Sequence, residues 1–538
     1  MQIKKILKFI DNNLLFGLCL FLLAFIPLYP KWPLFDILEG YNVRIRLEDF
    51  LVLLTFIIWF VYVLRDKINL KKIPLLKPIL LYIIVGFVSI LSALFITKTV
   101  FFDTYQILKV FLHWFRRIEY FSLFFVYFSA IYDKKQIKAY LAILVTTIIG
   151  VTTYGFGQKY LYWPAYSTMN REFSKGIKLY LSEHARVLST FAGHYDLAAF
   201  VMMTLIFLLV LLFMTKNKWL KFFLGIITFL EYWILILTSS RTSFLAYLGA
   251  LTIVFFLLAL KKSWKWAIPR YFLVFFISMI IMLSLGDLSD RFAQVIHVED
   301  FKNNFHRALN NLIPKPENGI AIDDISEASN VIAMSDVPPS TIKPKLPADV
   351  TYAPPIEIPI LASESSEATA ASGAAYTYTP RTFSNFAQKY GLSLGIRFDV
   401  LWVNALNAFM YNPVLGTGYS TLVKATVNER TTAESTDNDY LRALGETGIL
   451  GLAAFLFIFY VILKLLYQAF KKTSNEFYYS LFAIGIAMTL GLLINATLID
   501  VFEASKVAYF FWSMIGFFLA LVFLVEREDK KKESKIKK

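Results

Sequence analysis

The chain has 538 residues, of which 57% are hydrophobic, a mean hydropathy of +0.57 and a formal net charge of +15. A water-soluble protein cannot keep so much apolar surface away from solvent, so the composition indicates a set of membrane-spanning segments. The single cysteine, Cys19, excludes an intramolecular disulfide and a cysteine-based metal cluster, and five histidines argue against a multi-histidine metal site.

Apolar runs of roughly the 20-residue length that crosses a hydrocarbon core recur along the chain and predict twelve transmembrane helices. The first run is too long, and lacks a small-residue cleavage site, to be a removable signal peptide. The predicted fold is therefore an all-α membrane protein. The predicted spans are Leu14–Pro30, Phe50–Leu64, Pro78–Ile96, Val110–Ile131, Ile137–Tyr154, Leu197–Phe213, Trp219–Leu237, Phe244–Leu260, Pro269–Leu285, Ile449–Phe470, Phe477–Leu498 and Val507–Val525.

Lysine and arginine collect before the first predicted span, after each even-numbered span as far as the tenth, and in the tail from Lys530 to Lys538. This distribution is typical of loops on the cytoplasmic side, so it predicts that both termini are cytoplasmic. It also accounts for the positive net charge without a nucleic-acid partner.

Two outer segments are long, at 155–196 and between the ninth and tenth spans. The middle of the second, Asp323–Pro380, is rich in Pro, Ser, Ala and Thr and is predicted to be a flexible insertion. Beyond it, Arg397, Trp402, Leu406 and Phe409 recur at helical spacing as far as Asn412-Pro413, which predicts an amphipathic helix on the outer membrane surface. We divide the chain into an N-terminal bundle (1–185), a second region containing the insertion (186–525) and a basic tail (526–538).

Unusual polar residues collect at the predicted outer ends of the helices. Arginine at membrane depth costs about 2.5–3.5 kcal/mol on insertion scales, so it faces a partner or a water-filled cavity. Several arginines on one face favour an anionic ligand, and the guanidinium group suits phosphate oxygens. The residues of this kind are Arg116, Arg117, Glu119, Arg186, His194, Asp196, Ser239, Ser240, Arg241, Arg397, Asp437, Asn438, Asp439 and Glu446.

Some of these residues also have a simpler structural explanation. Arg116 and Glu119 are spaced to form an i, i+3 ion pair within one helix. Arg241 is compatible with a side chain that extends to the membrane interface, and His194 with a structural interfacial histidine.

Three segments of the sequence resemble the O-antigen ligase and O-antigen polymerase superfamily. The first runs from Asn412-Pro413-Val414-Leu415-Gly416-Thr417-Gly418-Tyr419, through Asp437-Asn438-Asp439, to Glu446-Thr447-Gly448-Ile449-Leu450-Gly451. The others are Thr238-Ser239-Ser240-Arg241 and Arg186-Val187-Leu188-Ser189-Thr190-Phe191. The resemblance extends over about Arg186–Val525.

The resemblance implies a membrane glycosyltransferase of the GT-C type that moves a glycan from undecaprenyl pyrophosphate to an acceptor hydroxyl on the outer face of the cytoplasmic membrane. Its partners would be this lipid-linked donor, a glycan or lipid acceptor and membrane lipids, with no cofactor and no metal. The diphosphate would be bound by Arg186 and Arg241, with Arg397, Arg116 and Arg117 as further candidates.

The ligases of this superfamily carry histidine where this chain has Asp437, and this departure favours a polymerase over a ligase. The candidates for the general base that takes the acceptor proton are Asp437, Asp439 and His194. The glycines have a physical role in either enzyme. Gly416 and Gly418 are predicted to permit a tight turn, and Gly448 and Gly451 close packing of the tenth span.

Three other functions are compatible with twelve spans. A secondary transporter would show a repeat between its halves and charges near the membrane midplane, and the sequence has neither. A lipid-linked oligosaccharide flippase would carry its arginines deep in a central cavity. A metal-dependent GT-C enzyme would need ligands such as Glu48 and Asp49 in the first outer loop.

Overall fold

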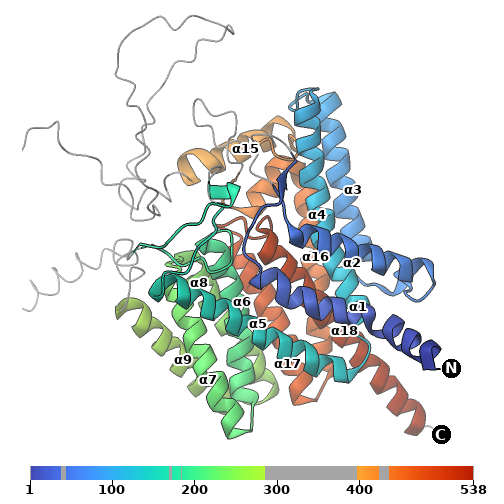
Figure 1. Cartoon of the computed structure of the whole chain (residues 1–538), viewed down its shortest axis with the longest axis vertical. Helices are drawn as coiled ribbons and strands as arrows, with labels where there is room; N and C mark the ends of the chain where they lie inside the picture. Colours follow the sequence, from blue (N-terminus) through green and yellow to red (C-terminus); the bar gives the residue numbers. More distant parts are fainter. Residues whose placement is uncertain are drawn as a thin grey trace, which may run out of the picture.

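A computed structural model describes residues 2–37, 44–168, 173–182, 185–284, 395, 397–422 and 435–536 of the chain. These residues form a helical bundle with one two-stranded sheet, in which β1 (Phe35–Asp36) pairs antiparallel with β2 (Arg44–Ile45) (Figure 1). The predicted all-α membrane fold is confirmed. The predicted insertion at 323–380 lies outside the described residues.

The long helices follow the predicted spans closely, because every predicted range overlaps one of them. They are α1 (Gln2–Leu28), α2 (Leu47–Leu64), α3 (Leu76–Leu91), which continues as the π-helix η2 (Ser92–Ile96), α4 (Thr104–Ala130), α5 (Lys134–Tyr160), α6 (His194–Met214), α7 (Lys218–Leu237), α8 (Arg241–Lys261), α9 (Trp264–Ser284), α16 (Asp439–Lys472), α17 (Glu476–Asn495) and α18 (Ser505–Ile536). Short 3₁₀ turns occur at η1 (Leu70–Lys72) and η3 (Phe173–Lys175).

Ten of these helices are long and apolar enough to cross a membrane. The two other predicted spans fall on α1, whose apolar part is the shorter Asn13–Leu28, and on α4. Charged residues interrupt the apolar character of α4, among them Lys109, Arg116, Arg117 and Glu119. The chain is thus a multi-pass membrane protein, and α4 carries charges in the middle of the helix.

Short polar side chains begin many of these helices. Asp103, Asp133, Asn217, Ser240 and Asn475 each accept a hydrogen bond from a backbone N–H of the first turn of α4, α5, α7, α8 and α17, respectively. Such caps satisfy donors that the first turn of a helix leaves without partners, so they fix where each helix begins.

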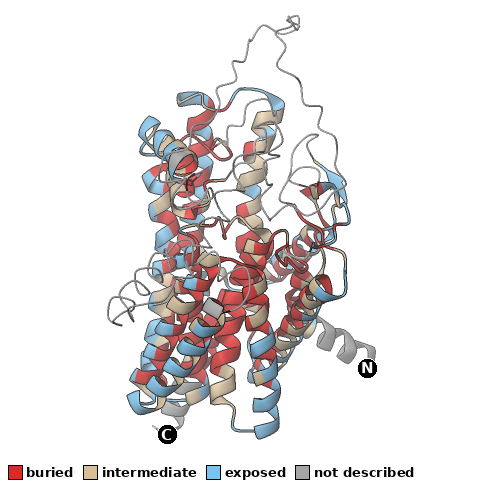
Figure 2. Cartoon of the chain, turned by 90° about the vertical axis from the view of Figure 1, so that its left-hand side faces the viewer, coloured by how far each residue is buried: buried red, intermediate tan, exposed pale blue. Residues whose placement is uncertain are grey.

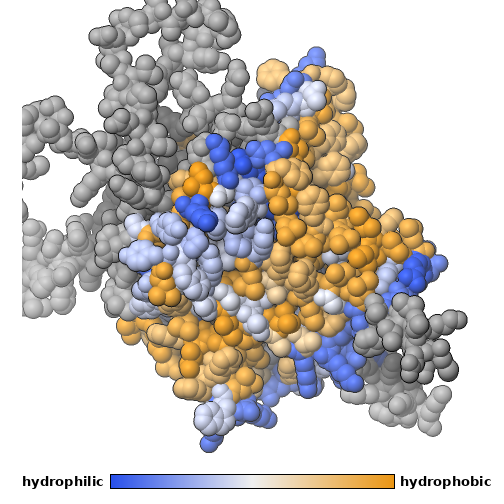
Figure 3. All heavy atoms as spheres, viewed as in Figure 1, coloured by the Kyte–Doolittle hydropathy of each residue, from blue (hydrophilic) through white to orange (hydrophobic). Residues whose placement is uncertain are grey.

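The centre of the bundle is α18. Of its apolar segment, 94% is buried, and α18 packs against α1, α4, α6, α16 and α17. Figure 2 shows the buried residues concentrated inside the bundle. The backbones of α4 and α18 approach closely at Gly516, where an added Cβ would lie 2.9 Å from the carbonyl oxygen of Phe124. On the surface shown in Figure 3, hydrophilic side chains gather in the upper middle, between two hydrophobic areas.

The predicted amphipathic helix is present as the π-helix η5 (Arg397–Leu401) followed by α15 (Trp402–Tyr411). Arg397 begins it and Asn412 caps its end, as expected. Ala405 is buried against the bundle, whereas Val403, Leu406 and Met410 are exposed. That exposed apolar face suits a membrane surface, which remains a prediction.

Lys506, at the start of α18, connects the end of α1 and the segment before α6 at one end of the bundle. Its ammonium group is buried and donates to the carbonyl oxygens of Pro27 (3.2 Å), Thr190 (2.7 Å) and Tyr29. The end of α1, the segment before α6 and the start of α18 therefore meet at one cation.

We predict that Lys506→Met destabilises the protein by about 3 kcal/mol or more, because three buried carbonyls lose their donor at about 1–3 kcal/mol each. Thermal unfolding of the purified protein in detergent would measure the change. Lys261 is the matched control, since it also donates to two carbonyls, those of Lys471 and Thr473, but solvent reaches it. An equal loss in Lys261→Met would contradict the role given to burial.

Candidate functional site

The turn at 413–418 packs against the beginning of α16. The backbone N–H of Thr417 donates to the carbonyl of Gly445, and that of Gly418 to the carbonyl of Glu446, both at 2.9 Å. α3 joins the same contact, because the Ser89 hydroxyl lies 2.9 Å from the Glu446 carbonyl oxygen. Two motifs that lie about 30 residues apart in the sequence thus form one structural unit.

Two glycines make this contact possible. Gly448 has a φ of +66° and interrupts α16, and a Cβ there would lie 2.3 Å from the carbonyl oxygen of Val414. Gly416 has a φ of +68°, and its Cβ would lie 2.5 Å from the backbone of Glu446. Both positions exclude a side chain, because the left-handed conformation and the close approach each disfavour one.

The other two motif glycines differ. Gly418 also has a positive φ and faces Ala93 of η2, whereas a Cβ at Gly451 would meet the side chain of Thr447 in its own helix. The tight turn predicted for Gly416 and Gly418 is therefore present. The neighbour at Gly451 is within α16 and not another span.

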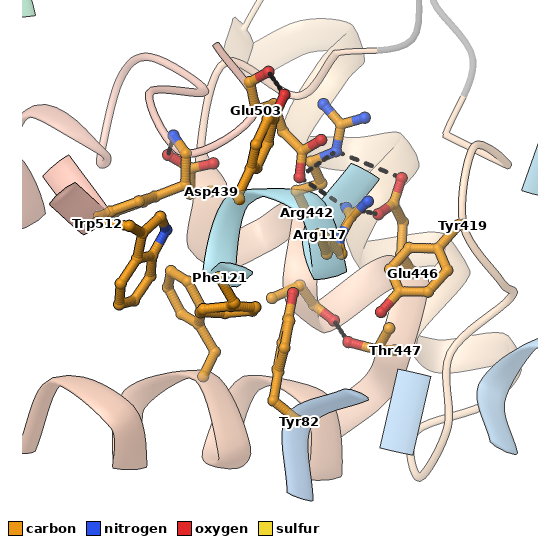
Figure 4. A pocket seen from close by; sticks show the side chains of 14 residues that line it. Tyr82, Arg117, Phe121, Tyr419, Asp439, Arg442, Glu446, Thr447, Glu503 and Trp512 are labelled. Atoms are coloured by element: carbon orange, nitrogen blue, oxygen red, sulfur yellow. Dashed lines mark hydrogen bonds and ion pairs between the residues drawn. The ribbon is translucent and has the colours of Figure 1, made fainter. Parts of the chain in front are cut away.

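A network of buried charges lies beneath this unit (Figure 4). Arg117 of α4 donates to Glu446 at 3.1 Å and to Glu503 at 2.6 Å. Arg442 lies 3.4 Å from Glu446 and 3.0 Å from Asp500. Two arginines thus alternate with three carboxylates from α16 and the turn before α18, so the charges are largely compensated.

The network borders a small cavity of about 30 Å³, enough for one or two water molecules. Aromatic rings form much of its wall, and the guanidinium of Arg117 lies 4.1 Å from the ring centre of Tyr419. Of the charged residues singled out in the sequence, Arg117, Asp439 and Glu446 line this cavity, whereas the others do not.

Asp500 organises the segment before α16. Its carboxylate accepts hydrogen bonds from the backbone N–H of Asn438 (2.7 Å) and of Thr436 (3.2 Å) and from the hydroxyl of Ser435 (2.8 Å), in addition to Arg442. The position of Asp437 and Asp439 therefore depends on a residue about 60 positions further along the chain.

The two predicted acidic bases have different environments. Asp437 accepts from the Ser435 hydroxyl at 2.7 Å and forms an ion pair with Arg397 at 3.1 Å. Asp439 is buried and accepts from the backbone N–H of Phe502 at 3.2 Å. Asp437 is the more accessible of the two, with 29% of its side chain exposed.

His194 is adjacent to Arg186. A guanidinium nitrogen of Arg186 lies 2.6 Å from Nε2 of His194, and both side chains are buried. Because arginine only donates, Nε2 must accept, which requires a neutral imidazole with its proton on Nδ1. Two of the predicted diphosphate ligands, Arg186 and Arg397, are therefore each paired with a predicted base.

Arg241 begins α8 directly after Ser240, which caps the helix. The same end of α8 reaches α17 through Ser243 and Asn495, whose side chains are 3.1 Å apart. The backbone N–H of Val187 donates to the carbonyl of Leu237 at 3.1 Å, which brings the Arg186 segment beside the turn that precedes Arg241.

Arg116 is paired with Asp49 at 2.9 Å and with Glu119 at 3.1 Å. The i, i+3 pair within α4 that the spacing allows is thus present. Glu48, the other carboxylate of the first outer loop, pairs with Lys31 at 2.7 Å.

Sequence analysis assigned no role to Arg442, which lies within the family motif, and did not identify Asp500 or Glu503. A signal existed for each of them. Arg442 precedes Glu446 by one helical turn, and two carboxylates in the short turn between the last two spans are unusual at a membrane surface.

Gly448→Ala is expected to lower the free energy of unfolding by ~2 kcal/mol or more, because an alanine at this φ is strained and its Cβ collides with Val414. Thermal unfolding would measure it. Gly225→Ala in α7 is the control, since its nearest neighbour would be 3.9 Å away and alanine favours a helix interior. A neutral effect at Gly448 would mean that the turn and α16 do not pack as described.

Asp500 also predicts a dependence of stability on pH. Burial alone would raise the pKa of Asp500, but Arg442 and hydrogen bonds from Ser435, Asn438 and Thr436 outweigh it and lower the pKa below 3.8. The carboxylate therefore stabilises the fold above its unfolded pKa, and this contribution is lost as pH falls through the lower folded pKa.

Wild-type protein should lose stability as pH is lowered below about 4, whereas Asp500→Asn should be less stable at neutral pH and change less over that acidic range. Unfolding midpoints between pH 3 and 7, roughly the range between a titrating aspartate and neutrality, test this. The exposed Asp66→Asn is the control. Parallel profiles for wild type and Asp500→Asn would refute the assignment.

Comparison with known proteins agrees with the geometry. Residues 224–456, from within α7 to within α16, match the family described as O-antigen ligase, and this range includes Arg241, the 413–418 turn and the break at Gly448. A search among curated proteins finds no match. This match supports the resemblance of the chain, a multi-pass membrane protein, to the O-antigen ligase and O-antigen polymerase superfamily.

Proposed function

We propose that the protein transfers a glycan from a polyprenyl diphosphate, of the undecaprenyl type, to an acceptor hydroxyl at the outer face of the cytoplasmic membrane. The observation that carries the proposal is the pairing of arginines with candidate bases, Arg186 with His194 and Arg397 with Asp437, at the helix ends that adjoin the family motif. We include Arg241 in the proposed site because the start of its helix, α8, contacts α17 and the Arg186 segment contacts the end of α7.

Three of the seven non-glycine residues with a positive φ in the described part of the chain lie in these segments. Ser189, Ser239 and Asp437 have φ values of +50°, +51° and +49°. Each lies within three residues of a proposed ligand or is itself a candidate base. Non-glycine residues in this conformation are uncommon and cluster where function requires an unusual geometry.

The chemistry follows from these pairs. A base takes the proton of the acceptor hydroxyl, the oxygen attacks the anomeric carbon, and the bond from that carbon to the phosphate oxygen breaks, so that the lipid diphosphate leaves with the bonding electrons. Arginines stabilise the negative charge that develops on the diphosphate. If Arg397 binds phosphate, Asp437 would lose its ion-pair partner and its carboxylate would be free to accept the acceptor proton.

We infer a polymerase and not a ligase, because Asp437 replaces the histidine of the ligases. The outward orientation is supported by the distribution of basic residues. The end of the bundle opposite this site carries Arg65, paired with Asp11, and Lys262, paired with Glu476. The division of the chain into 1–185, 186–525 and the tail 526–538 remains a prediction.

Arg241→Ala and Arg186→Ala are each expected to reduce transfer by about 10²–10³-fold, the usual cost of removing one group that stabilises developing charge. Asp437→Asn is expected to have an effect of at least that size if it is the base. The measurement is elongation of a labelled undecaprenyl-pyrophosphate glycan by the purified protein in nanodiscs, with Arg65→Ala, an exposed arginine at the opposite end, as the control.

Transfer only to a separate acceptor would identify a ligase. Movement of intact lipid or of a small solute across a bilayer, without transfer to any acceptor, would contradict the enzyme function and favour a flippase or a transporter.

A further inference from the structure

Glu231 places a carboxyl group inside the membrane-spanning part of the bundle. It is the only acidic residue of α7, and its side chain is fully buried. Leu237, the last residue of the helix, follows it by about 9 Å along the helix axis at 1.5 Å per residue. An ionisable group at this depth is expensive and is retained where it has a function.

Two threonines from neighbouring helices contact this carboxyl group. Thr152 of α5 donates a hydrogen bond to Oε2 of Glu231. Oγ1 of Thr204 in α6 lies 2.7 Å from Oε1. Both threonines are buried, and α7 packs against both of their helices (Figure 1). The carboxyl group therefore joins three spans at one point.

An ionised Glu231 would have no cation to balance its charge. Within the described residues, both of its oxygens contact hydroxyl groups, and no lysine, arginine or histidine is paired with it. Glu446, which is also buried, is by contrast paired with Arg117 and Arg442. A carboxylate without a cation in an apolar interior is so costly that the group takes up a proton instead.

The geometry at Thr204 gives the same result. Its hydroxyl oxygen lies 3.0 Å from the carbonyl oxygen of Phe200, one turn earlier in α6, as well as close to Glu231. Because a hydroxyl group carries one proton, it can donate to only one of these oxygens. If Oε1 of Glu231 carries a proton, Glu231 donates to Thr204 and Thr204 donates to Phe200. Oε2 still accepts from Thr152, so a neutral carboxyl group gives every one of these atoms a partner.

The segment that follows Arg186 is bound to two of the same helices. The hydroxyl of Ser189 donates to the carbonyl of Val151 in α5 at 2.7 Å. The backbone N–H of Val187 donates to the carbonyl of Leu237 at the end of α7. The distance between α5 and α7 therefore determines where this segment lies.

α5 and α7 approach closely between Glu231 and this segment. A Cβ at Gly155 would lie 2.9 Å from Cδ1 of Ile234 and 3.3 Å from Cγ1 of Val187. Gly155 lies one turn after Thr152 in α5, and Ile234 one turn after Glu231 in α7. Residues one turn apart share a helix face, so the hydrogen bond and the close contact hold the same two faces together.

We propose that Glu231 is held as a neutral carboxylic acid and, by joining α5, α6 and α7, positions the Arg186 segment and the turn before Arg241. It is a positioning residue, because it contacts none of the proposed ligands of the diphosphate. Its part in the reaction rests on the proposed function, whereas its protonation does not.

The protonation is tested by infrared difference spectroscopy of the purified full-length chain in detergent at neutral pH. The spectrum of wild type minus Glu231→Gln should show the C=O stretch of a carboxylic acid, which shifts in heavy water. The exposed Asp66→Asn is the matched control and should remove the bands of a carboxylate instead. Loss of carboxylate bands in Glu231→Gln would overturn the proposal.

The positioning is tested by the transfer measurement described above. Glu231→Leu should lower kcat about tenfold or more with little change in KM, because the arginines move relative to one another. Glu231→Gln should keep kcat within about threefold of wild type, since an amide retains an acceptor and a donor for the two threonines. Thr228→Val is the control and should not change kcat, because the buried Thr228 hydroxyl donates to Leu224 within α7.

If Glu231→Leu does not fold, Thr152→Val removes one of the two contacts and should lower kcat in the same way. Wild-type rates in Glu231→Leu, or in Thr152→Val where only that variant folds, would overturn the positioning. Equal loss of transfer in Glu231→Leu and Glu231→Gln, with unchanged thermal unfolding, would show that a carboxylate is needed and would also overturn it. A wild type that has the carboxylic acid band but transfers no glycan would contradict the proposed function and leave the neutral carboxyl group in place.

Discussion

Charged groups buried at one end of a membrane bundle need partners, because the low dielectric of that environment makes an uncompensated charge expensive. This constraint organises the end of the bundle that holds the charge network. Arg117 and Arg442 are held by Glu446, Glu503 and Asp500, and these three carboxylates come from two separate parts of the chain. These ion pairs therefore fix the position of α4 relative to α16 and to the turn before α18.

The break at Gly448 allows the start of α16 to bind the 413–418 turn next to this network. A continuous helix would leave no free carbonyls for the 413–418 turn, whereas the interruption lets the backbone of Gly445 and Glu446 accept from Thr417 and Gly418. The side chain of Glu446, one turn after Arg442, then points to the arginines. A single residue thus supplies a backbone carbonyl to the turn and a carboxylate to the charge network.

The helices could be predicted from the sequence because a span is a local property of about 20 apolar residues and its ends carry local caps. The 413–418 turn could be predicted from its glycines for the same reason. The charge network could not, because Arg117 is 329 residues from Glu446 and 386 from Glu503, and no local pattern specifies such pairs.

The pairing of bases with arginines bears on how such a site avoids unproductive chemistry. While Arg397 holds Asp437 and Arg186 donates to His194, neither base is fully available to a hydroxyl or to water. A diphosphate competes for the same guanidinium groups and carries more charge than a carboxylate, so it would displace the bases from their arginines. Activation of the base would then require a bound donor. The same arginines would therefore couple donor binding to proton transfer.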